Sequence, residues 1–567
     1  MELVTLLRQE TSKTSYPLVG YSALSGAASA ALIGIINTAA EKVTNDTLNW
    51  ELSILYALCL GIVFITKRYV LDESAVLVET IVNRLRHRLA DKVRHTELNT
   101  LEKNGSATIY ARISQDTTTL SNVSTLAIHG IQHAVVISFT LLYISSISLW
   151  SFFIITAGLA IGALYFMGLA DTFSKMWQEV SKKQTQFFEK LNFIIIGFKE
   201  IKINRLKNEK VFRNYTKVNN ELRNQRIKTT KNYNIRLLFT ESFFYILLGV
   251  VLFALPKLHA EHSDVLIKVV ASVLFIIGPL NEILFAVPNI ANANNSAMNI
   301  MNLEKELEEE LEKLGKNRLN PNSPEAYKSL PFNKNLVLSQ LAFKYPTTKT
   351  GMNFQVGPID LEIKKGELIF ITGGNGSGKS TFLKLFTGLY KPTGGHIMLD
   401  QNEDKRGTLV NLQNYQQYQN LLSTIFSDYH LFDQLYGVEG EVDPETVNSV
   451  LEMMDLPAKK VSFQNGAFTS IRLSSGQKKR LALVTSIIED KGILIFDEVA
   501  ADLDPTFRDK FYYELLPALK KRNKTILAVS HDQQYWLVPD RMLHFQDGSI
   551  KELSREEMKS LVEMAIK

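Results

Sequence analysis

Six long apolar stretches alternate with polar segments in the first half of the chain. Each has about the length that a helix needs to cross a bilayer, roughly 20 residues. The expected spans cover residues 16–40, 50–66, 128–150, 152–169, 238–255 and 265–287. The third and fourth are almost continuous, so they predict a hairpin. The pattern therefore predicts an all-α transmembrane domain of six helices.

Two long polar segments, 67–123 and 171–236, separate these spans and contain no proline and little glycine. Their apolar residues recur with helical spacing. If each segment runs out and back, half of about 60 residues at 1.5 Å per residue gives a helix pair of roughly 45 Å. We expect the turns near Asn104-Gly105 and near 202–208. Helices of this length suit the transmission of motion to a cytoplasmic domain.

Charge predicts the orientation in the membrane. The segment 171–236 is strongly basic, whereas the short connections 41–49 and 256–264 carry few Lys or Arg. The positive-inside rule then places both long segments and both termini in the cytoplasm. The same rule accounts for the basic residues better than RNA binding does, and a net charge of +5 gives no case for a nucleic-acid partner.

Small and polar residues stand out within the expected spans. A stripe of small residues four apart favours close helix packing over pore lining; it consists of Ser22, Gly26, Ala30 and Gly34. Glu241, Asn281 and Glu282 are costly in lipid, so we expect them to face the bundle interior or water. They are candidates to line a substrate path. For Glu241, a place at the headgroup level near Arg236 fits equally well.

The second half of the chain has the composition of a soluble α/β protein. After residue 287 the sequence becomes polar and Glu-rich, and the prolines at 321 and 324 end the helical pattern. We expect a transmembrane domain at 1–302, a linker at 303–334 and a further domain at 335–567. The single cysteine, Cys59, excludes disulfide frameworks and Cys-based metal sites within one chain. No cleavable signal peptide is expected at the N-terminus.

A phosphate-binding loop lies between the apolar run 368–371 and a helix-like stretch. The loop fits G-x-x-x-x-G-K-[ST] and leads into Thr381; its residues are Gly373, Gly374, Asn375, Gly376, Ser377, Gly378, Lys379 and Ser380. Glycines let successive N–H groups point at phosphate oxygens. Lys379 reaches the β- and γ-phosphates, and the Ser380 hydroxyl is a ligand for Mg²⁺. The chain is therefore expected to bind a nucleotide triphosphate.

Further residues with matching chemistry follow in a fixed order. The buried-strand run 493–498 ends in Asp497, which suits the Mg²⁺ shell, and in Glu498, which is placed to polarise a water. The strand 525–531 delivers His531 to the γ-phosphate. Tyr345, ahead of the phosphate loop, can stack on adenine.

A second anion site is expected upstream of these carboxylates. Free N–H groups at the start of a helix favour an anion, and the segment before the helix near 478 holds Ser474, Ser475, Gly476 and Gln477. The chain's own phosphate loop cannot use this site for the same nucleotide. We therefore expect it to serve a second copy of the chain. Asp504 lies in a short acidic segment downstream.

The motifs from residue 336 onward resemble the nucleotide-binding domain of ATP-binding-cassette proteins, and the six spans resemble a half-transporter of the exporter type. The resemblance implies that two chains enclose two ATP molecules, each between one copy's Lys379 loop and the other's Ser474–Gly476 segment. It makes Glu498 the catalytic base, Asp504 an inter-subunit contact and His531 the switch histidine. A homodimer in membrane lipid is preferred to pairing with a different half-transporter.

The sequence departs from the family pattern at one position that matters. Ser427 stands where most members have a glutamine. Because its side chain is shorter, Ser427 would bind Mg²⁺ either directly or through a water, and Asp428 is an alternative ligand. Ser475 replaces a glycine. The segments 426–432, 473–480 and 497–505 are similar to bacterial exporters of cyclic or modified peptides, including siderophore precursors.

These features predict an ATP-driven efflux transporter in the bacterial inner membrane that uses ATP and Mg²⁺. The expected cargo is a peptide-like secondary metabolite. One alternative is export of lipids or hydrophobic drugs. Another is a non-transporting membrane ATPase that senses or gates, although Glu498 and His531 argue against it because both catalytic groups are present.

Overall fold

A computed structural model of the chain describes Leu3, Thr5, Leu6 and residues 16–42, 50–254, 263–313, 323–345, 354–401, 407–438 and 440–566. The chain divides into two compact units. The membrane unit comprises residues 1–96 and 104–309, and the ATPase unit comprises 97–103 and 310–567. The expected domain boundaries at 302/303 and 334/335 stay predictions.

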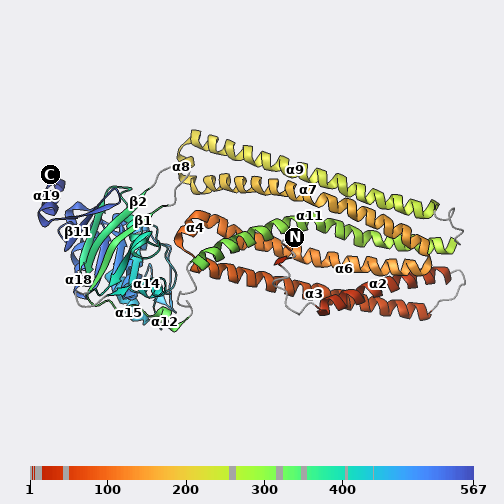
Figure 1. Cartoon of the computed structure of the whole chain (residues 1–567), viewed down its shortest axis with the longest axis horizontal. Coiled ribbons are helices and arrows are strands. Elements are labelled where there is room, and N and C mark those ends of the chain that lie inside the picture. Colours follow the sequence, from red (N-terminus) through yellow and green to blue (C-terminus); the bar gives the residue numbers. More distant parts are fainter. Residues whose placement is uncertain are drawn as a thin grey trace. The chain divides into compact units, whose positions relative to one another are not determined.

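Long helices make up the membrane unit (Figure 1). In the described part of the chain they are α2 (Tyr16–Lys42), α3 (Trp50–His95), α6 (Thr117–Ile147), α7 (Leu149–Ile196), α9 (Arg205–Gly249) and α11 (Ser263–Lys313), with the shorter α5 (Ser106–Tyr110) and α8 (Phe198–Ile203). Among the described residues, five helices are long and apolar enough to cross a membrane, and α7 opens with a shorter apolar stretch at Leu149–Tyr165. The expectation of an all-α transmembrane domain built on six long helices is therefore confirmed, whereas the cytoplasmic location of the helix extensions stays a prediction.

The connections between these helices test the expected turns. Only Ser148 separates α6 from α7, which confirms the hairpin. Gly105 has a φ of +76° just before α5, which confirms the first turn. The second turn was expected near 202–208, and the observed turn overlaps this range but begins earlier: α7 ends at Ile196, the short α8 follows, and the extended Asn204 precedes α9. A Cβ at Gly197 would lie 2.7 Å from the carbonyl oxygen of Phe193, so glycine lets the chain leave the helix there.

The stripe of small residues on α2 is a packing surface. A Cβ added at Gly26 would lie 2.8 Å from Val135, and Gly34 makes a similar approach to Tyr143 at 3.2 Å. Both partners belong to α6. Glycine therefore allows α2 and α6 to pack closely, which confirms packing over pore lining.

Two main sheets form the ATPase unit (Figure 1). The four-stranded sheet has the order β2-β1-β4-β5, made of β1 (Asn335–Lys344), β2 (Gln355–Lys364), β4 (Gly394–Leu399) and β5 (Thr408–Leu409). The six-stranded sheet has the order β12-β11-β3-β10-β9-β6, made of β3 (Leu368–Gly373), β6 (Leu422–Ile425), β9 (Ile493–Asp497), β10 (Thr525–Val529), β11 (Arg541–Gln546) and β12 (Ser549–Leu553). A small hairpin pairs β7 (Phe463–Gln464) with β8 (Ala467–Phe468). The expected α/β domain is confirmed.

Helices accompany these sheets. They are α4 (Leu98–Asn104), α12 (Pro324–Tyr327), α13 (Lys379–Phe386), α14 (Tyr415–Gln419), α15 (Pro444–Met453), α16 (Ser475–Ile488), α17 (Pro505–Lys510), α18 (Leu516–Lys521) and α19 (Arg555–Ile566). Strand β3 is buried along its whole length. Phe370 packs into one hydrophobic cluster, while Ile369 and Ile371 pack into another. Both faces of the sheet are thus covered, as parallel strands require.

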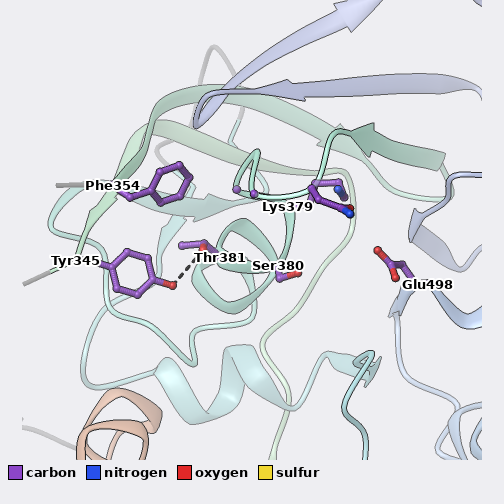
Figure 2. Close-up of a pocket in the computed structure, with 9 residues that line it drawn as sticks. Tyr345, Phe354, Lys379, Ser380, Thr381 and Glu498 are labelled. Carbon is purple, nitrogen blue, oxygen red and sulfur yellow. Dashed lines mark hydrogen bonds between the residues drawn. The ribbon is translucent and has the colours of Figure 1, made fainter. Parts of the chain in front are cut away.

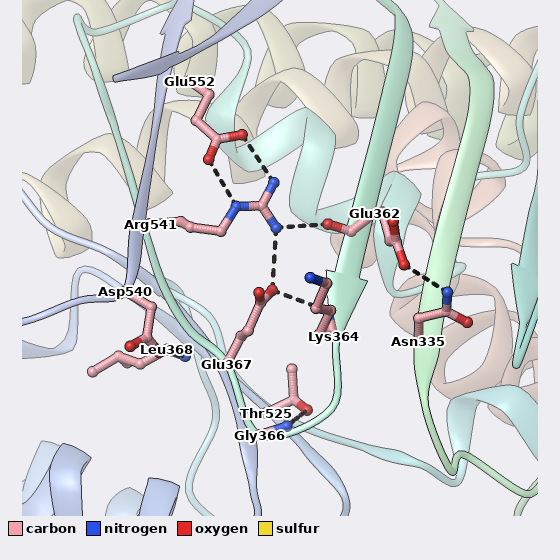
Figure 3. A network of polar contacts seen from close by, with 10 residues as sticks. All are labelled: Asn335, Glu362, Lys364, Gly366, Glu367, Leu368, Thr525, Asp540, Arg541 and Glu552. Carbon is pink, nitrogen blue, oxygen red and sulfur yellow. Dashed lines mark hydrogen bonds and ion pairs between the residues drawn. The ribbon is translucent and has the colours of Figure 1, made fainter. Parts of the chain in front are cut away.

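Arg541 of β11 connects the two sheets (Figure 3). Its guanidinium pairs with Glu552 of β12 at 2.8 Å and with Glu367 at 3.1 Å. It also donates to the carbonyl oxygen of Glu362 on β2 at 2.7 Å. These contacts tie the edge of the six-stranded sheet to the four-stranded sheet. The parallel strands β3, β10 and β9 are neighbours, so their carboxyl ends meet at one edge, where ligands bind in such sheets.

Candidate nucleotide site

The loop between β3 and α13 has a shape that only glycine permits. Gly373 has a φ of +144°, and a Cβ there would lie 2.3 Å from the carbonyl oxygen of Phe545. Gly378 has a φ of +109° and precedes the first residue of α13. The backbone therefore curls at the positive end of a helix, which is the arrangement that holds phosphate.

Lys379 lies folded over this loop. Its Nζ donates hydrogen bonds to the carbonyl oxygens of Gly373 and Gly374, at 2.9 and 3.0 Å. Burial lowers the pKa of Lys379, and the carboxylates of Glu498 and Asp497 partly oppose that shift. The buried hydroxyl of Ser377 has no hydrogen-bond partner among the described residues. A cation and an unpaired donor thus lie where phosphate oxygens are expected.

A cavity of about 430 Å³ opens beside the loop (Figure 2). It is lined by Tyr345, Phe354, Asn375, Gly376, Gly378, Lys379, Ser380, Thr381 and Glu498. The hydroxyl groups of Tyr345 and Thr381 are 3.1 Å apart. The cavity has aromatic rings at one end and charged groups at the other, which matches a nucleotide with its base at Tyr345.

Phe354 is a lining residue that no motif singled out. Its ring centroid lies 6.4 Å from that of Tyr345, and both rings face the cavity (Figure 2). It stands just before β2, outside any recognisable pattern. An aromatic residue at a strand start is usually read as core, so the sequence carries no signal for this position.

The carboxyl ends of β9 and β10 bring the proposed catalytic groups together. Nε2 of His531 lies 3.2 Å from Oε1 of Glu498. Glu498 has a φ of +53°, a left-handed backbone that is uncommon for glutamate. Such strain persists only where neighbouring contacts hold it. The loop after His531 is itself held, because Asp532 accepts from the hydroxyl of Tyr512 at 3.0 Å.

Asp497 is nearly buried, with 2% of its surface exposed. Burial raises the pKa of Asp497, and the N–H of Ser427 donates to its carboxylate at 3.4 Å. The backbone of Ser427 therefore lies beside Asp497, and the role of Ser427 in metal binding stays a prediction. Ser380 lies at the start of α13, on the cavity wall.

The segment 474–477 lies elsewhere. Ser474 caps α16 by accepting from the N–H of Gln477, whose side chain accepts in return from the N–H of Ser474. Ser475 is the first residue of the helix, and a Cβ at Gly476 would approach the carbonyl oxygen of Asp502 to 2.8 Å. None of these residues lines the cavity at Lys379.

Asp504 has partners within its own chain. Its carboxylate accepts from the N–H of Phe507 at 3.0 Å and pairs with Arg480 of α16. Its expected contact across a subunit interface stays a prediction. In the membrane unit, Glu241 lies on α9, whereas Asn281 and Glu282 lie on α11.

Lys479 of α16 holds the backbone of the proposed catalytic glutamate. Only 5% of Lys479 is exposed, and its Nζ donates to the carbonyl oxygen of Glu498 at 2.7 Å. The same ammonium lies 3.5 Å from the carboxylate of Asp502. Lys479 is thus a positioning residue that connects the segment at Ser474 with Glu498.

Replacing this lysine tests the connection. We expect Lys479→Met to lower kcat for ATP hydrolysis about tenfold, because a buried carbonyl loses its donor, while KM for ATP stays unchanged. Lys478→Met, at the exposed neighbouring position, is the matched control. Steady-state kinetics of both purified variants provide the measurement, and an unaltered kcat for Lys479→Met would contradict the positioning role.

The fold and site define a membrane-embedded phosphate-loop ATPase of the ATP-binding-cassette type, an exporter half-transporter. Protein-family models described as ABC transporter and ABC transporter transmembrane region match residues 356–501 and 19–278. The chain belongs to the ABC transporter family, and its ATPase activity is coupled to transport.

Individual relatives agree with this assignment. "ATP-binding protein SyrD" of Pseudomonas syringae pv. syringae is 31% identical over 551 residues, covering 93% of this chain and 92% of the relative. "Energy-coupling factor transporter ATP-binding protein EcfA1" of Mycoplasma mobile is 31% identical over 220 residues, covering 38% of this chain and 77% of the relative. A solved bacterial Atm1-family ABC exporter with ATP bound has the same fold, with a TM-score of 0.76 at 14% identity, covering 99% of this chain and 98% of that one.

Proposed function

We propose that two copies of the chain form a homodimer that exports a peptide-like secondary metabolite across the inner membrane of a bacterium. The cargo class is a cyclic or modified peptide, or a siderophore precursor, and both termini lie in the cytoplasm. The observation that carries the proposal is the fusion of the membrane unit to a complete ATPase unit, together with similarity to SyrD over 93% of the chain. The motif segments around Ser427 and Ser474 support the cargo class.

The homodimer is supported by the position of the segment 474–477. Because this segment does not line the cavity at Lys379, its helix N-terminus is free to meet the phosphates held by a second copy. Two copies then hold two ATP molecules at their shared face. Hydrolysis at the full rate by protein held strictly monomeric would overturn this part of the proposal.

The donor set beside Lys379 fits Mg²⁺. The buried carboxylate of Asp497 and the hydroxyl of Ser380 are hard oxygen ligands, which Mg²⁺ prefers, and Ser427 lies next to Asp497. The raised pKa of Asp497 reflects burial, a cost that a cation would offset. When bound, Mg²⁺ would neutralise charge on the phosphates. Ser380 and Asp497 would hold it, with Ser427 direct or through a water.

The chain's own residues supply the rest of the reaction. Tyr345 and Phe354 hold the base, and Lys379 meets the β- and γ-phosphates. Glu498 takes a proton from a water molecule while the oxygen of that water bonds to the γ-phosphorus. The bond between the γ-phosphorus and the bridging oxygen breaks, which gives ADP and phosphate. His531 keeps the carboxylate of Glu498 aimed at that water.

Residues 97–103 lie between two membrane helices in the sequence but belong to the ATPase unit, and they offer a route for coupling. Glu102 accepts from Nζ of Lys384 at 2.7 Å and from the hydroxyl of Tyr390 at 2.5 Å. Burial opposes ionisation of Glu102, but these two hydrogen bonds outweigh it and lower the pKa of Glu102. Lys384 lies on α13, and the ring of Tyr390 is 6.0 Å from that of Tyr345. Residues 97–103 therefore contact the helix that follows the phosphate loop and an aromatic neighbour of Tyr345.

Two alternatives remain as outcomes of the test. One is export of lipids or hydrophobic drugs, and the other is a membrane ATPase that does not transport. The contact between Glu498 and His531 argues against the second, because it is an arrangement suited to turnover.

Transport by the reconstituted protein separates these functions. In liposomes with the ATPase unit outward, we expect peptides to stimulate ATP hydrolysis and to accumulate inside only with ATP. A fluorescent hydrophobic dye and a labelled phospholipid serve as competing cargoes. Accumulation of the dye or lipid without any peptide response would replace the cargo class. Hydrolysis that moves none of them would favour the non-transporting ATPase.

A further inference from the structure

Two histidines of one membrane helix lie within electrostatic range of ionisable side chains from two other helices. His129 and His133 lie one turn apart on α6, so they share a face of that helix. Lys67 of α3 and Glu282 of α11 each lie within electrostatic range of both imidazoles. We name these four residues the mixed-charge cluster. It lies toward the ends of the expected spans that the positive-inside rule assigns to the cytoplasm.

One contact places α11 beside this part of α6. A Cβ added at Gly130 would lie 4.0 Å from the Cβ of Ala286, one turn beyond Glu282. Because His129 and His133 stand on either side of Gly130, this approach is consistent with Glu282 lying within electrostatic range of both imidazoles.

The cluster is not satisfied by its own members. Nε2 of His129 is buried and has no hydrogen-bond partner among the residues that the structure describes. Lys67 and Glu282 are exposed within the single chain. Ionisable groups within membrane helices are costly and usually mark a substrate or ion path. A buried polar atom without a partner calls for an explanation, and a bound ligand would supply one.

The chemistry of the cluster selects the ligand. Within the described residues, no group of three His, Cys, Asp or Glu side chains could hold a metal ion. Lysine and imidazole donate to a carboxylate, whereas glutamate accepts from an ammonium group. Both signs of charge are thus offered side by side, which matches a group that carries both.

Resting on the proposed function, we propose that the mixed-charge cluster is a cargo-binding site for an amino-acid-like zwitterionic group. The carboxylate of the cargo meets Lys67 and the imidazoles, and its ammonium group meets Glu282. The cluster lies toward the cytoplasmic ends assigned to these spans, which is the side from which an exporter takes up its cargo. Glu282 disfavours an anionic lipid headgroup, because like charges repel where the dielectric is low.

The test uses one peptide in four forms. The full-length protein is reconstituted in phosphatidylcholine, and a pentapeptide of alanine and leucine is added with free termini, N-acetylated, C-amidated or doubly capped. The measurement is the concentration that gives half-maximal ATPase stimulation, relative to each sample's own basal rate. Each single cap is expected to raise this concentration about tenfold, the effect of losing one charged hydrogen bond.

Variants assign each end of the peptide. Lys67→Gln is expected to abolish the effect of C-amidation and keep that of N-acetylation, and Glu282→Gln is expected to do the opposite. The matched control is Arg68→Gln, an exposed cation on the same helix that lies 3.6 Å from Asp72. It should keep both effects. The comparison of capped and free peptides on the unaltered protein does not depend on the folding of any variant.

Four results would overturn the site. Equal stimulation by free and doubly capped peptide would reject it while leaving peptide export standing. Loss of the capping effect in Arg68→Gln as well would show that the peptide responds to the overall charge of the helix and not to the cluster. A capping effect that appears only when anionic lipid is added would assign the cluster to a lipid headgroup. If no form of the peptide stimulates, the proposed cargo class fails and the site fails with it.

Discussion

Glu498→Gln is expected to lower the rate of ATP hydrolysis about 1000-fold, within the range that general bases contribute, and to leave ATP binding intact. The amide has nearly the shape of the carboxylate, so the left-handed backbone and the bond from Lys479 are retained. It cannot accept the proton of the attacking water. ATP should therefore accumulate in the closed dimer. Phosphate release and retention of labelled ATP after gel filtration measure the two halves of this result.

The matched control is Glu514→Gln, an exposed glutamate of the ATPase unit, which should hydrolyse ATP at the normal rate. His531→Ala gives a second comparison. Because His531 contacts Glu498 at 3.2 Å, its loss should also slow hydrolysis. Rapid hydrolysis by Glu498→Gln would show that Glu498 is not the catalytic base and that its carboxylate has a structural role.

Much of this architecture could be predicted from short stretches of sequence. The loop at Gly373 and Lys379 is local, because its shape depends on glycine conformation and on the strand and helix that flank it. The six spans are equally local, since a bilayer demands about 20 apolar residues in a row. Asp497 and His531 each follow a short apolar strand pattern, so the sequence could assign one to the metal and the other to the γ-phosphate of the same nucleotide.

Other features depend on contacts between distant segments. Glu102 and Tyr390 are 288 positions apart, and no local pattern pairs them. Lys479 reads as one more charge on an amphipathic helix, yet it is buried against Glu498. Its role follows from the contacts between α16 and the residues that follow β9. The mixed-charge cluster likewise needs three helices in register, which periodicity within each helix does not determine.

Lys379→Ala is expected to weaken ATP binding about 100-fold, because two charged hydrogen bonds to phosphate are lost. The ammonium group donates to the carbonyl oxygens of Gly373 and Gly374. We expect it to exchange these acceptors for phosphate oxygens when nucleotide binds. Burial lowers the pKa of Lys379. The positive charge of this lysine is therefore destabilised in the folded chain until an anion binds beside it. Isothermal titration calorimetry with ATP and the Glu498→Gln background, which prevents turnover, measures the affinity.

The lowered pKa also predicts the stability of this variant. A lysine whose folded pKa lies below its unfolded value destabilises the folded state at neutral pH, since the unfolded chain binds the proton more tightly. Lys379→Ala removes that cost, so the melting temperature without nucleotide should not fall, whereas the rise in melting temperature caused by ATP should largely disappear. Lys364→Ala, an exposed lysine on β2, should keep that rise. Unchanged ATP affinity in Lys379→Ala would count against the phosphate loop as the nucleotide site, because no other described cation lines the cavity.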